Sequence, residues 1–367
     1  MNVHLWSPRF TGFGGGITAF SCELALGLRS LGHHVQLIGK LDRPGFWDAF
    51  SVCGAGDYLP VLQKPGFAVT ALSACAWQRP DHLISIHLNF GPLAHWAKRA
   101  FGTPFTLVAH GIDVHNDLSA ARRRAFLSAE RVVAVSEWTR RRLLDLGIKP
   151  THIAVLPNTV NESRFTVAAR PEWLADRYNL RPGERVVLTV ARLDSTEGYK
   201  GYDRIVQALV AIQASCGPVR FIVVGAGDDR ARLKALARAV GIEQAVTFGG
   251  FVPDDELADH YRLADVFAMP STGEGFGIVF LEAMACGTPV LGGNCDGSVD
   301  ALDGGRLGRL VDPNDTSAIA SGIIALLKRE GAAWWFDRDS LHNAVIKRFG
   351  RAAFQKNLQK VFSPTLH

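Results

Sequence analysis

Residues 270–290, PSTGEGFGIVFLEAMACGTPV, place glycines on both sides of a carboxylate, Glu274, and then continue with apolar residues at helical spacing. A glycine and a proline close the pattern, as they do at many helix ends. The pattern predicts a helix that begins near Phe276, with its unpaired N–H groups and positive dipole end beneath the glycine loop. Glu282 lies about two turns further on, so the two carboxylates can face one ligand site at different depths. A solvated helix face would explain the carboxylate pair alone, but it would not require glycines at the helix entrance.

The length of 367 residues predicts two domains, and strand and helix patterns alternate in two successive runs. Near-continuous apolar strands separated by helices are typical of parallel sheets covered on both faces. The predicted fold class is therefore α/β, with two doubly wound domains. Residues 41–80 show no clear period. The predicted strands include Val3–Trp6, Val35–Ile38, His82–His87 and Phe105–Ala109 in the first run, and Val186–Ala191, Phe221–Gly225 and Val266–Met269 in the second.

The composition is that of a globular protein with a sizeable core, since 47% of the residues are hydrophobic and 20% are charged. No apolar run approaches the roughly 18 residues of a membrane span. The first residues are typical of a strand and not of a signal peptide. Six cysteines without metal-ligand or framework spacing indicate thiols in a reducing compartment. These features predict a cytoplasmic protein.

The net charge of +5 is unevenly distributed. Residues 1–165 contain 17 Lys and Arg against 11 Asp and Glu, whereas the remainder contains 23 against 24. The excess is concentrated in two arginine triplets, residues 122–124 and 140–142. Two solvated helix faces would explain the triplets, and so would a cationic surface that meets phosphates or an anionic membrane at the inner face of the plasma membrane. Nucleic acid is not an expected partner, because no aromatic residues are interleaved with these arginines.

Candidate ligand-binding residues follow the ends of predicted parallel strands, where ligands bind in doubly wound folds. His110 follows the strand Phe105–Ala109, and Asp113 comes shortly after it as either a loop cap or a site residue. Arg192 and Lys200 follow the strand Val186–Ala191, where two cations can neutralise a diphosphate. Ser136 is either the N-cap of a helix or a ligand contact.

A glycine-rich loop, residues 12–16, joins the first predicted strand to a helix at about 17–31. Amides of such a loop can approach a phosphate closely. The loop is not a complete GxGxxG pattern, because Ile17 occupies the last glycine position, and no ribose-binding acid follows the second strand cleanly. A nicotinamide cofactor is therefore not favoured.

The stretch from Glu274 to Glu282, followed by Ala-Met-Ala-Cys-Gly-Thr-Pro-Val, resembles the E-x7-E pattern of retaining GT-B glycosyltransferases, above all those of family 4. The resemblance implies a GT-B fold of two Rossmann-like domains facing a central cleft. It places the acceptor-side domain in residues 1–165, the nucleotide-sugar domain in 166–347, and a C-terminal helix at about 348–367 that crosses back to the first domain. Thr159 and Ala191 stand where the family usually has glycine.

The same resemblance assigns roles to individual residues. It implies that His110 and Glu274 contact the donor sugar and that Arg192 and Lys200 stabilise the leaving diphosphate, while Glu282 accepts from ribose hydroxyls. No metal is expected, since cations and a helix dipole would take its place and the Asp-Arg-Asp at 337–339 lies in the tail. The further donor-binding residues implied by the family are Gly15, Gly16, Gly225, Gly227, Phe251, Val252, Gly275, Phe276, Gly277 and Ile278.

The donor and the acceptor stay open at this stage. The segments around Lys200 and Glu274 most resemble mannosyltransferases that use GDP-mannose and extend polyprenyl-diphosphate-linked saccharides. A UDP-sugar-dependent glucosyl or N-acetylglucosaminyl transferase is the alternative. The E-x7-E spacing argues against a sugar-nucleotide epimerase, and no lysine suits a cofactor-dependent phosphorylase. A catalytically silent sugar-nucleotide-binding protein is the non-enzyme alternative.

Overall fold

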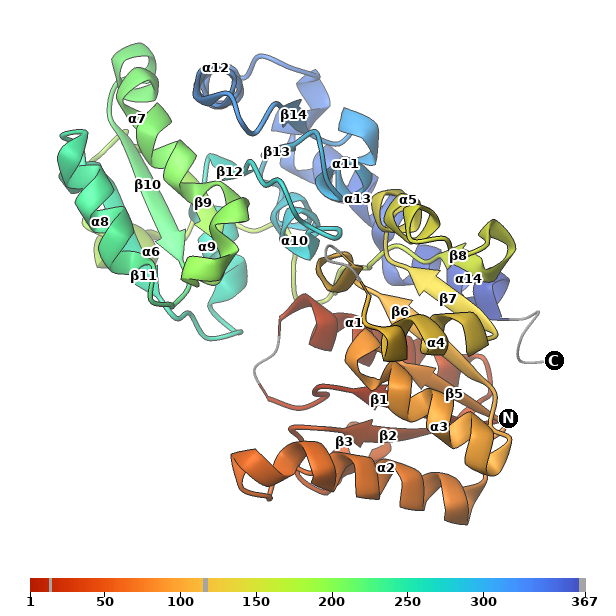
Figure 1. The fold of residues 1–367 in the computed structure, drawn as a ribbon. Coiled ribbons are helices and arrows are strands. Elements are labelled where there is room, and N and C mark those ends of the chain that lie inside the picture. Colours follow the sequence, from red (N-terminus) through yellow and green to blue (C-terminus); the bar gives the residue numbers. More distant parts are fainter. Residues whose placement is uncertain (13–14, 115–117, 363–367) are drawn as a thin grey trace. The chain divides into compact units, whose positions relative to one another are not determined.

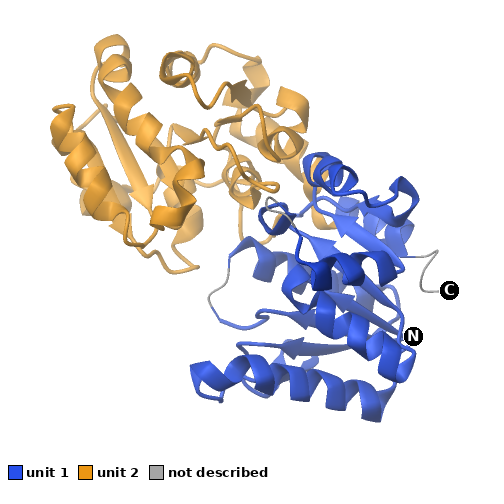
Figure 2. Ribbon diagram, viewed as in Figure 1, with its two compact units in different colours: residues 1–159, 352–367 blue, residues 160–351 orange. Residues whose placement is uncertain are grey.

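The computed structural model describes residues 1–12, 15–114 and 118–362. The chain divides into two compact units, residues 1–159 with 352–367, and residues 160–351 (Figure 2). The first boundary thus lies at residue 159 where the sequence predicted 165. Residues 338–349 form a helix of the second unit, α13, and the C-terminal helix α14 (Arg351–Phe362) packs with the first unit after a break at Gly350.

The first unit is built on one eight-stranded sheet with the strand order β3-β4-β2-β1-β5-β6-β7-β8 (Figure 1). Every pairing is parallel except that of β3 with β4. The connections run in opposite directions from β1, to β2 on one side and to β5 on the other, so the sheet switches direction there. The strands are β1 (Asn2–Ser7), β2 (His34–Gly39), β3 (Gly45–Trp47), β4 (Phe50–Gly54), β5 (His82–Ser85), β6 (Phe105–Ala109), β7 (Arg131–Ala134) and β8 (Ile153–Val155).

Helices pack on both faces of this sheet because its strand side chains are buried on both sides. Four helices share one core with Trp6, Leu83 and Leu107, and α1 contacts β1 and β2, whose alternate side chains point to the other face. The four helices are α2 (Gln63–Gln78), α3 (Gly91–Phe101), α4 (Ala120–Ser128) and α5 (Glu137–Asp145), and α1 spans Gly16–Ser30.

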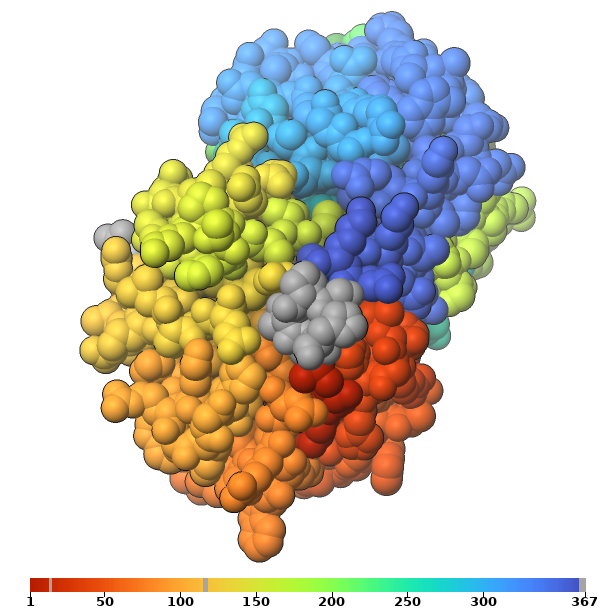
Figure 3. Space-filling model, turned by 90° about the vertical axis from the view of Figure 1, so that its right-hand side faces the viewer, coloured from red at the N-terminus to blue at the C-terminus, as the bar shows by residue number. Residues whose placement is uncertain are grey.

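The C-terminal helix α14 returns to pack on α1. The Phe20 and Phe354 rings meet edge to face with centroids 6.0 Å apart, and Leu358 lies so close to Gly27 that a Cβ there would be 2.5 Å from it. In Figure 3 the dark blue residues of the chain's end adjoin the red residues of its beginning. The helix predicted at the C-terminus is therefore part of the first unit's core; residues 363–367 lie outside the described chain.

Residues 41–80, for which the sequence showed no period, contain the β3–β4 hairpin and the helix α2. Phe67, Ala71 and Cys75 form the buried face of α2, one residue per turn. Val69 and Trp77 are exposed on the same helix. Because α2 carries apolar side chains on its outer face as well, its sequence lacks the contrast between faces that reveals a helix.

The second unit contains a six-stranded, fully parallel sheet with the order β11-β10-β9-β12-β13-β14. Its direction switches between β9 and β12, which are neighbours in space. The strands are β9 (Arg185–Val190), β10 (Val219–Val224), β11 (Val246–Gly250), β12 (Val266–Met269), β13 (Val290–Gly293) and β14 (Arg309–Val311).

Helices α7, α8 and α12 share a core with one face of this sheet. An aromatic series packs elsewhere in the unit, in which Tyr261, Phe267 and Phe280 meet edge to face at 5.7 and 5.5 Å. That series joins α9 to β12 and α10. The helices are α6 (Glu172–Arg177), α7 (Tyr202–Cys216), α8 (Arg230–Ala239), α9 (Leu257–Leu263), α10 (Ile278–Ala285), α11 (Ser298–Ala301), α12 (Thr316–Leu327) and α13 (Arg338–Phe349).

Short 3-10 helices complete the two units. Those used below are η2 (Leu88–Phe90), η3 (Ile112–Val114) and η5 (Ser195–Lys200). Within the described ranges, no helix combines the length and the apolar character that crossing a membrane requires.

Candidate functional site

The direction switch of the second sheet brings the chain after β9 next to the chain after β12. Ligands bind outside the carboxyl ends of the strands at such a switch point. The segment after β9 carries Arg192 and Lys200, and the segment after β12 carries Glu274. Topology alone therefore places three of the predicted site residues at one edge of one sheet.

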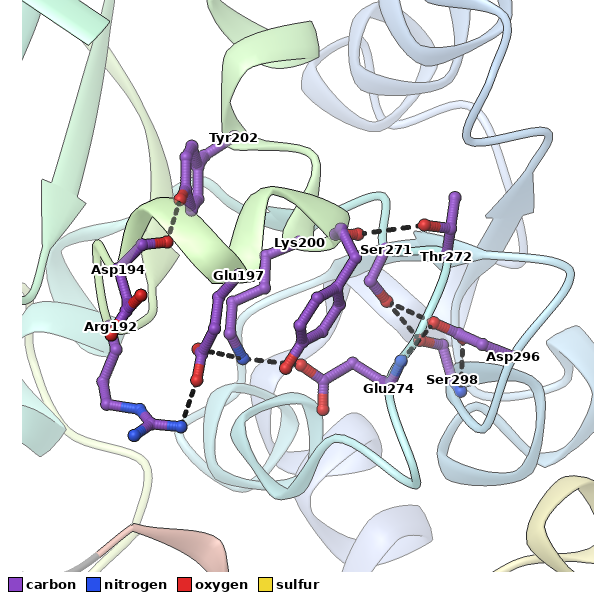
Figure 4. A network of polar contacts seen from close by, with 11 residues as sticks. Arg192, Asp194, Glu197, Lys200, Tyr202, Ser271, Thr272, Glu274, Asp296 and Ser298 are labelled. Carbon is purple, nitrogen blue, oxygen red and sulfur yellow. Dashed lines mark hydrogen bonds and ion pairs between the residues drawn. The ribbon is translucent and has the colours of Figure 1, made fainter. Parts of the chain in front are cut away.

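Lys200 is the centre of a charged cluster at this edge (Figure 4). Its Nζ lies 2.7 Å from Glu274 Oε1 and 3.6 Å from Glu197 Oε2, and its side chain is only 14% exposed. Burial alone would lower the pKa of Lys200, but the negative charges of Glu274 and Glu197 more than offset it, and the net shift is upward. Lys200 is therefore a permanent cation between two carboxylates.

Backbone contacts hold Lys200 in this place. Gly201 has a φ of +74°, and a Cβ on it would lie 2.2 Å from the Pro270 carbonyl oxygen. Thr272 N–H donates to the Tyr199 carbonyl at 2.8 Å. A residue with a side chain at 201 would push the end of η5 away from β12, so the Lys-Gly pair is required by packing as well as by conformation.

The loop that carries Glu274 is anchored by Asp296, a buried residue that the sequence analysis missed. Asp296 Oδ2 accepts from Ser271 Oγ and from the Glu274 backbone N–H, both at 2.7 Å, and Oδ1 accepts from Ser298 N–H at 2.9 Å (Figure 4). Burial raises the pKa of Asp296, and these donors oppose the rise. Its position three residues after β13, at the carboxyl edge of the sheet, is the sequence signal that could have revealed it.

Glu197 is the second residue that the sequence analysis missed. Its carboxylate is 6% exposed and binds the Arg192 guanidinium, whose own side chain is 74% exposed. The same carboxylate faces Lys200. The two predicted cations thus share one buried counter-charge, so this cluster is already close to neutral before any anion enters.

Gly225 and Gly227 have a packing role next to Arg192. A Cβ on Gly225 would lie 1.8 Å from the Ala191 carbonyl oxygen, and one on Gly227 would lie 1.9 Å from that of Leu193. The turn after β10 therefore packs backbone against backbone on the segment that presents Arg192. Whether these glycines also contact a ligand stays a prediction.

The helix α10 begins at Ile278, two residues later than predicted, and its N-cap Gly277 has a φ of +87°. Phe276 is buried against the Phe349 ring at 5.6 Å, so its side chain belongs to the core and only its backbone can serve a ligand. Gly275 is also buried, while Ile278 is half-buried at the start of the helix. The N–H groups of the first turn follow directly on the loop that bears Glu274. That of Phe280 donates to the Gly277 carbonyl oxygen at 3.1 Å.

Glu282 lies within α10, where its Oε2 accepts a hydrogen bond from the Tyr261 hydroxyl at 2.6 Å. Burial raises the pKa of Glu282, and the hydroxyl and Arg164 act against the rise. The two glutamates of the E-x7-E pattern therefore have different partners, a cation for Glu274 and a phenol for Glu282. Phe251 and Val252 follow β11, and Phe251 is 57% exposed.

In the first unit His110 is buried at the end of β6. Its Nε2 lies 2.8 Å from the Ile86 carbonyl oxygen, which can only accept, so Nε2 carries the proton and Nδ1 is the acceptor. Burial lowers the pKa of His110 to about 3, which keeps the ring neutral. Asp113 Oδ1 accepts from the His110 backbone N–H at 2.9 Å, so Asp113 does cap this loop.

Gly16 is the first residue of α1 and Gly15 is its N-cap. Phe13 and Gly14 of the predicted glycine loop lie outside the described residues. Asp42, after β2, accepts from the N–H groups of Phe10 and Thr11 at 2.7 and 2.9 Å and so anchors the start of the loop. Ser136 caps α5, because its Oγ accepts from Thr139 N–H at 2.9 Å.

The arginine triplets lie on α4 and α5. Arg140 pairs with Glu137 and Arg142 pairs with Asp145 along the surface of α5, as the solvated-face interpretation expects. Arg123 and Arg124 are exposed on α4. Exposed ion pairs of this kind stabilise little. The surface stays cationic because α4 carries three arginines and no acidic residue.

No group of three His, Cys, Asp or Glu side chains with a metal-binding arrangement occurs among the residues that the structure describes. The expectation that no metal is needed stays a prediction. All six cysteines are free thiols.

Comparison with known proteins places both units in one family. Residues 173–347 match the model described as glycosyl transferases group 1, and residues 15–159 match the model of a glycosyl transferase 4-like domain. A D-inositol 3-phosphate glycosyltransferase of Acidothermus cellulolyticus is 30% identical over 359 residues, with 86% of this chain and 79% of that protein covered. A GDP-mannose-dependent alpha-(1-6)-phosphatidylinositol monomannoside mannosyltransferase of Mycobacterium tuberculosis is 37% identical over 252 residues; the match spans 64% of each protein.

Solved structures agree on the fold. A sucrose-phosphate synthase from Thermosynechococcus elongatus has a TM-score of 0.82 at 22% identity, with 100% of this chain and 99% of that chain covered. The Anabaena protein HepE in complex with UDP and glucose has a TM-score of 0.80 at 19% identity, with 99% and 100% covered. The chain is a member of glycosyltransferase family 4, with a GT-B fold of two Rossmann-like domains.

Proposed function

We propose that this protein transfers a hexose, with retention of configuration, from a nucleotide sugar to a saccharide acceptor. The observation that carries the proposal is the position of Lys200, which is buried between Glu274 and Glu197 at the switch point of the second sheet. A lysine so placed can take up the charge that develops on a departing nucleoside diphosphate.

In this proposal the leaving group binds to the second unit. Arg192 and Lys200 neutralise its phosphates, together with the positive dipole end at the start of α10. Once the phosphates bind, the carboxylates that now pair with Arg192 and Lys200 would accept hydrogen bonds from other groups. Glu274 would accept from hydroxyls of the sugar. Glu282 would accept from the ribose, with Tyr261 fixing the orientation of its other oxygen. The neutral His110 would accept a sugar hydroxyl at Nδ1. No metal is needed in this scheme.

Mannose from GDP-mannose is our choice of donor. The relative from Mycobacterium tuberculosis carries this donor in its name, and the segments around Lys200 and Glu274 resemble mannosyltransferases. A UDP-sugar is the alternative.

For the acceptor we propose a saccharide linked to a polyprenyl diphosphate. Both named relatives act on phosphate-bearing acceptors, a phosphatidylinositol monomannoside and an inositol phosphate.

We further propose that the protein works in the cytoplasm, at the inner face of the plasma membrane. The cationic triplets on α4 and α5 would attract anionic lipids at about 1 kcal/mol per basic residue. Flotation with neutral and anionic vesicles tests this point. We expect binding only to anionic vesicles, and we expect it to be lost when the six arginines are replaced by glutamine. Equal partitioning onto both kinds of vesicle would mean that the triplets are only solvated helix faces.

The test of the main proposal is release of nucleoside diphosphate from a panel of GDP- and UDP-sugars, with the anomeric configuration of the product read by NMR. Release from GDP-mannose with retention is expected. Lys200→Ala should lower kcat by roughly 10²–10³, as loss of one transition-state charge partner does. The exposed Lys234 of α8 provides the matched control, since Lys234→Ala should leave kcat unchanged. Donor binding without turnover of any sugar would indicate the silent sugar-nucleotide-binding protein.

A further inference from the structure

The first unit contains a pocket of about 930 Å³ that the donor chemistry does not use. It opens at the carboxyl edge of the first sheet, where residues that follow β1, β2 and β5 line it. The direction of that sheet switches between β1 and β5, so this is a ligand position in the same sense as the switch point of the second sheet. The volume is in the range of small-molecule sites.

One part of this pocket is cationic. Lys40, Lys64 and Arg122 line it, and no carboxylate is among its lining residues. Burial, together with the charges of Arg122 and Lys40, lowers the pKa of His87 in the same pocket to about 4. The two cations therefore act on one point inside the pocket. Asn89 accepts from Arg122 and orients its guanidinium.

The other part of the pocket is apolar. Phe67 and Leu72 of α2 line it, together with Leu93 and Trp96 of α3. Trp96 is 52% exposed, so the aromatic wall reaches the surface. A free phosphate would leave this wall in water, and a neutral lipid would leave the three cations without an anion inside the pocket. Only a ligand that joins an anion to an apolar body satisfies both parts.

We propose that this pocket binds a phosphate ester that carries an apolar chain, with the phosphate between Lys40 and Arg122 and the chain along α2 and α3. The inference rests on the proposed function, in which such an ester is the phosphorylated end of the acceptor. It specifies the acceptor class: a saccharide without a phosphate-linked apolar chain would occupy only part of the pocket.

Calorimetric titration of the full chain with geranyl phosphate, geraniol, inorganic phosphate and a short-chain phosphatidylinositol tests the pocket without any donor. Geranyl phosphate is expected to bind at least tenfold more tightly than geraniol or inorganic phosphate, or about 1.4 kcal/mol, because charge-assisted hydrogen bonds to the phosphate and burial of the apolar chain both add to its affinity. The phosphatidylinositol arm shows whether a two-chain lipid fits equally. Geraniol binding as tightly as geranyl phosphate would overturn the proposal.

Substitutions of the cations that line the pocket locate the binding site. Lys40→Gln and Arg122→Gln should each weaken geranyl phosphate binding by about tenfold or more, whereas Arg122→Lys should keep most of the affinity. Arg124→Gln is the matched control, because Arg124 lies on α4, is exposed and does not line the pocket. Equal losses in Arg122→Gln and Arg124→Gln would mean general charge attraction and no pocket. If geranyl phosphate binds but no sugar nucleotide is turned over, the pocket stands and the proposed function falls.

Discussion

At the scale of single residues, the cations around Lys200, which we propose bind an anion, are paired with carboxylates of the same cluster. Two cations at a strand end would repel each other, and Glu197 offsets that repulsion from a buried position. An entering diphosphate must compete with this carboxylate. If the diphosphate binds here as we propose, it binds less tightly than it would to bare cations, which favours product release.

Glu197→Gln tests this interpretation. The substitution removes one negative charge next to the diphosphate position, so the nucleoside diphosphate should bind about fivefold more tightly, or about 1 kcal/mol. The kcat should fall because product leaves more slowly. Titration with GDP and UDP measures the affinity, and Glu243→Gln on an exposed ion pair is the control. Weaker binding in Glu197→Gln would instead mean that the carboxylate positions Arg192 and Lys200.

Asp113 gives the first unit a pH-dependent stability. Burial raises the pKa of this carboxyl to about 7, from an ordinary value near 3.8. Its Oδ2 has no hydrogen-bond partner, so ionisation is poorly compensated. The protonated carboxyl therefore makes its full contribution to the stability of the folded state below about pH 4. This contribution is lost as the pH rises to 7.

Asp113→Asn cannot ionise and should not lose stability in this pH range. The difference in unfolding free energy between Asp113→Asn and the wild type should shift in favour of the variant between pH 5 and pH 8, by on the order of 1–3 kcal/mol. Denaturant unfolding at the two pH values measures it. Asp57→Asn in the same unit, exposed beside Arg43, should show no such shift. A difference independent of pH would show that Asp113 is already ionised at pH 5.

At the scale of elements, the loop between β12 and α10 owes its shape to a segment that follows β13. A Cβ on Gly297 would lie 2.2 Å from the Gly275 carbonyl oxygen, and one on Gly293 would lie 2.1 Å from that of Ser271. Asp296, between these glycines, accepts the hydrogen bonds that hold the loop. The E-x7-E stretch is therefore shaped by residues that come after it in the chain.

Asp296→Asn tests this dependence. An amide cannot accept at both positions that the carboxylate serves, so one buried donor loses its partner, at a cost of about 1–3 kcal/mol in the free energy of unfolding. We expect kcat to fall together with stability, because Glu274 loses the bond to its backbone N–H. Ser271→Ala, which removes one bond and leaves that N–H paired, should lower stability with a smaller effect on kcat. Full kcat in Asp296→Asn would limit the role of Asp296 to stability.

At the scale of the whole molecule, we propose that side chains of the second unit provide the charge that a metal would otherwise supply. Sugar-nucleotide turnover should therefore survive dialysis against EDTA with kcat unchanged. Nucleoside diphosphate release before and after dialysis measures it, with added Mg²⁺ and Mn²⁺ as the second arm. Activity that disappears and is restored by either ion would contradict the proposal that Arg192 and Lys200 suffice.

The local part of the fold could be predicted because apolar runs and glycine positions act within a few residues. The strands and the helix after Gly277 follow from such patterns, and so does the position of Arg192, Lys200 and Glu274 in the segments after strand ends. The helix α2 escaped prediction, since its outer face is apolar too. Phe276 was predicted from the resemblance as a donor-binding residue, and only the structure shows that its side chain packs against Phe349, which leaves its backbone for that role.

The sequence by itself determined the family, the two doubly wound sheets and which residues stand at strand ends. Only the tertiary structure decided which charges meet. Lys200 and Glu274 are 74 residues apart and become partners because β9 and β12 are neighbours in the sheet. Glu197 and Asp296 gain their roles in the same way. Strand patterns are local and survive in the sequence, whereas the energy of a buried charge depends on neighbours that only the folded chain supplies.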